Sequence, residues 1–276
     1  MIKLFRFLNA LNFDTAIGAI VIASFVSYVC HHLIGWPVYL ALFISVLAIY
    51  NFDHLIDTLM LSEDAGTFRR AFYQRHFTVL IIWQLVLIII GIVIIFLLPM
   101  PVILAGTCML ILMGLYFWLI LKALKNNLVY REIFVAFGYT LAVSIVPIST
   151  TYSLTLKLVW IVLIIFLIAL SNLWVLAIYE LGIDQKELRH SIARSVQKSR
   201  LLNLARSLVF LEVIATIGFM FYFNLWMEGG LLLLIEATYF VLLEGRSLFD
   251  KEERYRLIGE AILILPVLMY VLNAKV

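Results

Sequence analysis

Long apolar segments alternate with short polar ones along the whole chain. Nine apolar runs, bounded by charged residues, Pro or Gly, are each about long enough to cross the ~30 Å hydrocarbon core of a bilayer as a helix. Their approximate limits are 14–34, 36–57, 76–98, 101–124, 131–150, 155–180, 202–224, 226–244 and 256–274. The pattern therefore predicts an all-α transmembrane bundle of about nine spans that forms a single domain, residues 1–276.

The N-terminal segment, MIKLFRFLNALNF, precedes the first of these runs and has a different pattern. Leu4, Phe7, Leu8 and Leu11 fall on one face of a helix. The segment lacks the small-residue cleavage pattern of a signal peptide. We therefore expect an amphipathic helix that lies in the membrane interface.

Composition agrees with a membrane protein. The chain is 65% hydrophobic and 13% charged, with a mean hydropathy of +1.10. This leaves too little polar surface to cover a soluble domain of ordinary size, and nothing in the sequence indicates a nucleic-acid partner. Cys30 and Cys108 belong to different apolar runs, so neither a disulfide framework nor a thiolate metal site is indicated.

The basic residues are distributed unevenly between the two predicted sides of the membrane. Only Lys157 and Lys275 fall on one side. The N-terminus and every second connection, with the adjoining helix ends, hold the other 18 of the 20, namely Lys3, Arg6, Arg69, Arg70, Arg75, Lys122, Lys125, Arg131, Lys186, Arg189, Arg194, Lys198, Arg200, Arg206, Arg246, Lys251, Arg254 and Arg256. By the positive-inside rule the N-terminus is cytoplasmic and, with nine spans, the C-terminus is outside. We expect a multi-pass protein of a bacterial-type inner membrane.

Two pairs of acidic residues lie at the predicted cytoplasmic ends of spans. The second span ends in IYNFDHLIDT, with Asp53 and Asp57, and the sixth ends in LAIYELGIDQKE, with Glu180 and Asp184. Residues four apart share one face of a helix. His54 is expected to face away from the two aspartates. The connections that follow or adjoin these ends, about 58–75, 122–131 and 181–201, are expected to cap a site on this face.

Like charges at this spacing repel, and carboxylates near a bilayer are poorly solvated. Two such pairs on one membrane face therefore favour a cation between them. Carboxylates, with retained water and ligand phosphates, are the usual ligands of Mg²⁺ in proteins. The alternative is that the acids only mark the membrane interface, where acidic residues are common.

With these motifs the chain resembles the UbiA superfamily of intramembrane prenyltransferases. That family carries N-D-x-x-D-x-x-x-D after its second span and D-x-x-x-D after its sixth. Here Ile49 and Tyr50 stand where the first motif has Asn and Asp, Asn51 is displaced by two residues, and Glu180 replaces an Asp of the second motif. The segment LKALKNNLVYREIFVAFGY also resembles the family's basic segment that leads into a Gly-containing helix.

The resemblance implies an Mg²⁺-dependent transfer of a prenyl chain from an isoprenyl diphosphate to a lipophilic acceptor inside the bilayer. Asp53 and Asp57 would hold one ion, and Glu180 and Asp184 a second. The charge of the departing pyrophosphate would be neutralised by the metal and by basic side chains.

The resemblance also implies substrate-binding residues of three kinds. The candidates are Lys122, Lys125, Arg131 and Arg69 or Arg70 for the phosphates, Asn51 and Asn172 for metal-bound water or phosphate, and Tyr179 with Tyr50, Phe52 and Trp174 as aromatic groups facing the allylic cation. Each kind has a simpler alternative. Basic residues set topology and meet anionic lipids, amides bond neighbouring helices, and aromatic residues form interfacial belts.

Other functions and other acids stay open at this point. A non-catalytic relative that acts as a scaffold, lipid binder or transporter fits the trimmed motifs, although nine spans do not divide into the repeated halves common in transporters. Glu212, Glu236 and Glu260 fall within the last three runs. Charged groups there are costly, so these acids are functional, protonated or paired with a donor from another helix.

Overall fold

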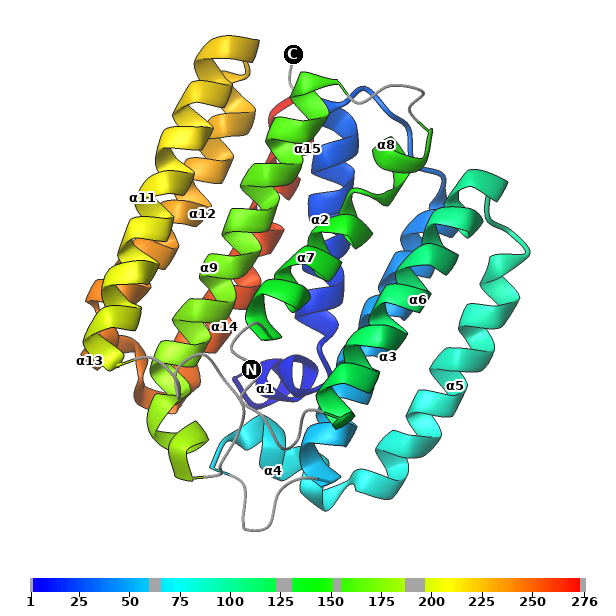
Figure 1. Cartoon of the computed structure of the whole chain (residues 1–276), viewed down its shortest axis with the longest axis vertical. Coiled ribbons are helices and arrows are strands. Elements are labelled where there is room, and N and C mark those ends of the chain that lie inside the picture. Colours follow the sequence, from blue (N-terminus) through cyan, green and yellow to red (C-terminus); the bar gives the residue numbers. More distant parts are fainter. Residues whose placement is uncertain (1, 60–65, 123–130, 151–154, 187–196, 274–276) are drawn as a thin grey trace.

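A computed structural model describes residues 2–59, 66–122, 131–150, 155–186 and 197–273. All regular structure in these residues is helical (Figure 1). The elements are α1 (Ile2–Ala10), α2 (Phe13–Val29), α3 (Trp36–Leu59), α4 (Phe68–Arg75), α5 (Phe77–Ile95), α6 (Met100–Lys122), α7 (Arg131–Val143), α8 (Ile145–Thr150), α9 (Leu156–Lys186), α11 (Lys198–Phe223), α12 (Trp226–Glu244), α13 (Arg246–Phe249), η2 (Lys251–Glu253), α14 (Arg254–Ala261), η3 (Ile262–Val267) and α15 (Leu268–Asn273).

Six helices in the described part of the chain are long and apolar enough to cross a membrane. They are Trp36–Leu59, Phe77–Ile95, Met100–Trp118, Leu156–Gly182, Lys198–Phe223 and Trp226–Glu244. The long helices run side by side along one axis (Figure 1). The prediction of an all-α membrane bundle is confirmed at this level, and the count of nine spans stays a prediction.

The three remaining apolar runs form shorter or interrupted helices. The run 14–34 forms α2, which has 17 residues. The run 131–150 is divided into α7 and α8 by a turn at Ser144. The run 256–274 comprises α14, η3 and α15, and Pro266 lies within the 3-10 segment η3. Pro cannot donate a backbone hydrogen bond, so it disfavours a continuous α-helix at this point.

The bundle has a buried centre and an exposed edge. Helix α9 packs against α7, α11 and α12, and much of its length is buried. By contrast, α5 and α6 lie at one edge (Figure 1), and most of their apolar side chains are exposed. An apolar surface of this extent is unusual for a soluble monomer, whereas in a bilayer it faces lipid.

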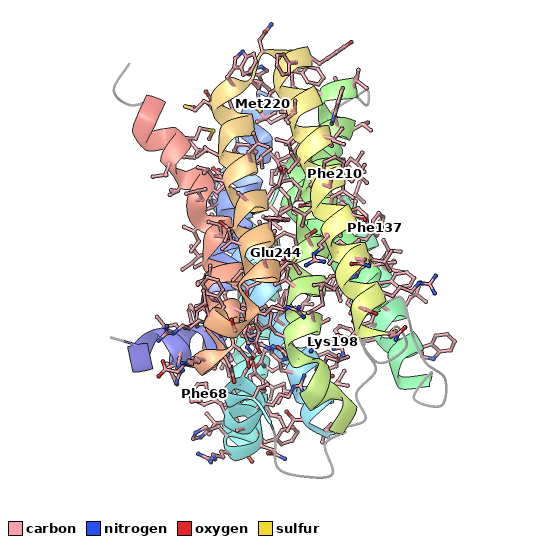
Figure 2. All side chains as sticks on the ribbon, turned by 90° about the vertical axis from the view of Figure 1, so that its left-hand side faces the viewer. Phe68, Phe137, Lys198, Phe210, Met220 and Glu244 are labelled. Atoms are coloured by element: carbon pink, nitrogen blue, oxygen red, sulfur yellow. The ribbon has the colours of Figure 1, made fainter. Side chains whose placement is uncertain are left out.

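The N-terminal helix lies across the bundle instead of along it. Both views show α1 roughly perpendicular to the long helices (Figures 1 and 2). Phe7 of α1 packs edge-to-face on Phe72 of α4, and Arg6 Nη2 donates to the Glu252 carbonyl over 2.8 Å. The position of α1 in the membrane interface stays a prediction.

Described basic residues gather at one end of the bundle. The C-terminal ends of α3 and α9, the N-terminal ends of α7 and α11, and α4 and α13 all lie toward the bottom of Figure 1. Figure 2 shows Phe68 and Lys198 toward this end and Met220 at the opposite one. We call it the basic end, defined by Arg69, Arg70, Arg131, Lys198, Arg246 and Arg254. Its assignment to the cytoplasm stays a prediction.

Candidate functional site

The first acid pair meets an arginine from another helix. Asp53 and Asp57 lie in the last two turns of α3, and Arg131 is the first residue of α7. Arg131 Nη2 lies 3.0 and 2.9 Å from the two Asp53 carboxylate oxygens, and 3.4 and 3.3 Å from those of Asp57. The positive charge that two neighbouring carboxylates favour is therefore provided in this structure by the Arg131 guanidinium.

His54 also belongs to this group of side chains. One ring nitrogen of His54 and one carboxylate oxygen each of Asp53 and Asp57 lie within 4.8 Å of one another. The prediction that His54 faces away was wrong. Successive helical residues point about 100° apart, but the imidazole is long enough to reach back toward the carboxylates. Its Nε2 also lies 3.3 Å from both Asn12 Oδ1 and Arg69 Nη1.

The second motif meets two arginines. Glu180 of α9 accepts hydrogen bonds from Arg70 Nη2 of α4, over 3.0 Å, and from Arg256 Nη2 of α14. All three side chains are buried. A buried charge requires a partner of opposite sign, and this triad supplies it from three separate helices. The side chains of Asp184 and Lys122, and the whole of Lys125, lie outside the described residues.

Arg69 forms a further buried ion pair. Its Nη2 lies 2.9 Å from each carboxylate oxygen of Glu260 in α14, and 3.1 Å from Asn9 Oδ1 of α1. Asn9 in turn donates to Glu260, over 2.5 Å, and to Asp14. Of the three acids in the last runs, Glu260 therefore has a basic partner and belongs to this end of the molecule.

The other two acids of the last runs lie elsewhere. Glu212 of α11 accepts a hydrogen bond from Ser171 of α9, and Glu236 of α12 accepts one from Thr216 of α11 over 2.5 Å. Both side chains are fully buried. They join α9, α11 and α12 through hydrogen bonds with hydroxyl groups.

A polar cavity of about 150 Å³ lies where these groups converge. Its charged lining consists of Asp53, His54, Arg69, Arg131, Glu132, Glu180, Arg256 and Glu260. Asn172 lines it as well, and its Oδ1 has no hydrogen-bond partner among the described residues. A Cβ at position 259 would lie 3.1 Å from that oxygen, so the absence of a side chain at Gly259 leaves room for the Asn172 amide. The structure thus brings residues of both predicted motifs to one cavity.

Two predicted binding residues do not line the polar cavity. Asn51 donates to Gln84 Oε1 over 2.8 Å and accepts from the Tyr73 hydroxyl over 2.9 Å, which joins α3 to α5 and α4. Burial raises the pKa of Tyr73, so the phenol keeps its proton for this bond. Tyr179 donates to the Leu242 carbonyl over 2.6 Å, and its ring stacks on Tyr255.

Two apolar cavities lie next to the polar one. The first, of about 60 Å³, shares Tyr50, Asp53 and Val135 with the polar cavity. The next, of about 120 Å³, adjoins the first through a set of shared residues, Ile49, Met109, Met113 and Ala142. We call the two together the apolar path; it follows α3, α6 and α7.

Sequence reasoning missed the apolar path. The available signal is a spacing of four between residues that are flexible or small, such as Met109 and Met113 on α6, and Gly138 and Ala142 on α7. Such residues occupy one face of each helix. Small side chains on one helix facing unbranched ones on the next leave space that a ligand can fill.

Acidic groups outnumber basic ones around the polar cavity. In the described part of the chain, four guanidiniums (Arg69, Arg70, Arg131 and Arg256) lie in or directly beside it with six carboxyl groups (Asp14, Asp53, Asp57, Glu132, Glu180 and Glu260). Asp53 and Asp57 supply the oxygen ligands that Mg²⁺ takes together with water and phosphate, so this pair fits the ion. The His54 nitrogen also suits transition metals.

No family model, curated protein or solved structure matches this chain. The resemblance to the UbiA superfamily therefore rests on the residues and motifs given above.

Proposed function

We propose that the chain is a UbiA-like intramembrane prenyltransferase with nine spans and a cytoplasmic active face. It transfers an isoprenyl chain from its diphosphate to a lipophilic acceptor and uses Mg²⁺. One observation carries the proposal: a charged cavity adjoins an apolar path between helices, and the two share lining residues. This combination complements a ligand with an anionic head and a long apolar tail.

The lining residues suggest how such a ligand binds. Arg69, Arg131 and Arg256 present guanidinium donors to the polar cavity, and guanidiniums bind phosphate oxygens in pairs of hydrogen bonds. The tail would lie along α3, α6 and α7, away from water. The bond between tail and diphosphate then falls beside Tyr50 and Asp53, which line both cavities.

The remaining roles follow from the charges that develop when the bond between the tail and the diphosphate breaks. Asp53 and Asp57 would hold Mg²⁺, which would supply the positive charge needed by the departing pyrophosphate. Glu180, with Asp184, is proposed for a second ion. The ring of Tyr50 offers an aromatic face to the allylic cation without acting as a nucleophile.

The direct test uses purified protein with Mg²⁺ and geranyl, farnesyl or geranylgeranyl diphosphate. We expect a rise in the thermal midpoint on binding, and release of pyrophosphate when a suitable acceptor is present or water replaces it. Absence of binding at every chain length would refute the proposal.

A second candidate function is a non-catalytic binder of a phosphorylated lipid. It is favoured by the pairing of Asp53, Asp57 and Glu180 with arginines, because such pairs stabilise a fold without chemistry. The same experiment separates the two functions. A binder gains thermal stability with each diphosphate but releases no pyrophosphate from any of them.

The apolar path predicts which substitution changes the choice of tail. A Cβ at Gly106 meets no described residue within 4 Å, and Gly106 lines the far apolar cavity. Gly106→Leu should fill that space and weaken binding of geranylgeranyl diphosphate about tenfold, since each CH₂ group left unburied costs about 0.8 kcal/mol. Geranyl diphosphate should bind unchanged, as measured by ligand-induced thermal shifts.

Gly114 provides a matched control on the same helix. A Cβ there also meets no atom within 4 Å in the described part of the chain, but Gly114 is exposed and lines none of the three cavities. Gly114→Leu should leave the preference for tail length unchanged. If Gly106→Leu and Gly114→Leu changed the affinities for long and short diphosphates in the same way, a tail site along α6 would be contradicted.

The nine-span topology has its own test. A reporter fused after Val276 should lie outside the cytoplasm, and one fused after Phe249, between the eighth and ninth predicted spans, should lie in the cytoplasm. A cysteine introduced at each of these two positions would test the same sidedness, through its accessibility to a membrane-impermeant label. A cytoplasmic reporter after Val276 would refute nine spans.

A further inference from the structure

Arg131 contacts both carboxylates of the first motif through a single nitrogen. Its Nη2 lies within 3.4 Å of all four oxygens of Asp53 and Asp57. The three side chains are 13–20% exposed, so solvent screens them only in part. The guanidinium thus lies where a divalent ion between the two carboxylates would lie.

The same guanidinium lines the polar cavity with two others. Arg69 and Arg256 also line it. Guanidiniums form charge-assisted hydrogen bonds with phosphate oxygens, often in pairs, so this lining suits a multiply charged anion. Such an anion would lie within reach of three guanidiniums, one of which is Arg131.

From these two observations we infer that Arg131 is an internal counter-cation, which holds the metal-binding carboxylates until a diphosphate draws it away. The inference rests on the proposed function. Two cations that compete for the same carboxylate oxygens exclude each other. Metal therefore binds weakly to the protein alone and tightly once an anion has engaged Arg131. Linkage requires the metal to raise the affinity for the anion by the same factor.

Removal of Arg131 tests the inference without any prenyl substrate. Mn²⁺ serves as the probe, because it accepts both carboxylate and imidazole ligands and its free form is measured by electron paramagnetic resonance. We expect Arg131→Met to bind Mn²⁺ about 10–100-fold more tightly than the unaltered protein in the absence of anions, within the range of typical coupling energies. Inorganic pyrophosphate should tighten Mn²⁺ binding mainly in the unaltered protein.

Three further variants complete the experiment. Arg131→Lys keeps the positive charge on a more strongly hydrated and more flexible side chain, so its Mn²⁺ affinity should lie between the other two. Asp53→Asn added to Arg131→Met should abolish the tight site. Arg206→Met removes an exposed arginine that pairs with Glu244 instead, and Mn²⁺ affinity should not change.

Two outcomes would overturn the inference. One is an Mn²⁺ affinity that is unchanged or weaker in both Arg131→Met and Arg131→Lys when each retains the helical circular dichroism of the unaltered protein. The other is tight Mn²⁺ binding that survives Asp53→Asn. Neither depends on pyrophosphate release, so failure of the proposed reaction is measured separately from failure of this inference.

Discussion

Replacing Glu180 with glutamine is expected to destabilise the protein by about 3–5 kcal/mol, the range observed when one partner of a buried ion pair is removed. Glutamine has the same shape but cannot neutralise Arg70 and Arg256, which would then face each other at less than 10% exposure. The loss is measured as a lower thermal midpoint in detergent and as a lower denaturant midpoint.

Added pyrophosphate and a surface variant test whether the loss of stability comes from the buried triad. An anion that enters the polar cavity should restore part of the lost stability, because it replaces the missing negative charge. Glu244→Gln breaks an ion pair with Arg206 that is exposed on both sides, so its midpoint should hardly change. Equal midpoints for Glu180→Gln and the unaltered protein would contradict the buried triad.

Asp53→Asn and Asp57→Asn are each expected to lower the rate of pyrophosphate release by about 100-fold or more, given the proposed function. An amide keeps a hydrogen bond to Arg131 but contributes no charge to a bound metal, whose stabilisation of developing charge is worth several kcal/mol. Initial rates with a saturating isoprenyl diphosphate and Mg²⁺ measure the effect.

The matched control is Asp250→Asn, which alters an exposed acid after α13, outside all three cavities. Its rate should equal that of the unaltered protein. Diphosphate binding that persists in EDTA and also in Asp53→Asn combined with Asp184→Asn would refute a metal bridge between phosphate and carboxylates.

Local spacing made part of this site predictable. Asp53 and Asp57 share a helical face because they are four residues apart, and the helix that carries them is defined by its apolar length. The basic end follows from the same kind of pattern, since charged residues occupy the connections between apolar runs. These features depend on neighbours in the sequence, so hydropathy and spacing capture them.

The partners of the acids were not predictable in the same way. Arg70 meets Glu180 across 110 residues, and Arg69 meets Glu260 across 191. Which carboxylate each guanidinium reaches depends on how α4, α9 and α14 pack, and adjacent arginines on one short helix give no hint that they diverge. The apolar path was not predicted for a related reason, because a cavity depends on the packing of side chains from three helices.

The two arginines of α4 have a consequence for biosynthesis. A ribosome that adds about 5–20 residues per second completes α4 long before the segments that carry Glu180 and Glu260, which follow by 110 and 191 residues. Arg69 therefore lacks its acidic partner for about 10–40 s. Because an unpaired guanidinium is costly to bury, we expect α4 to stay in the aqueous interface during this time. The charged cavity closes only when α14 arrives, so maturation of the site is a late event in insertion of the chain.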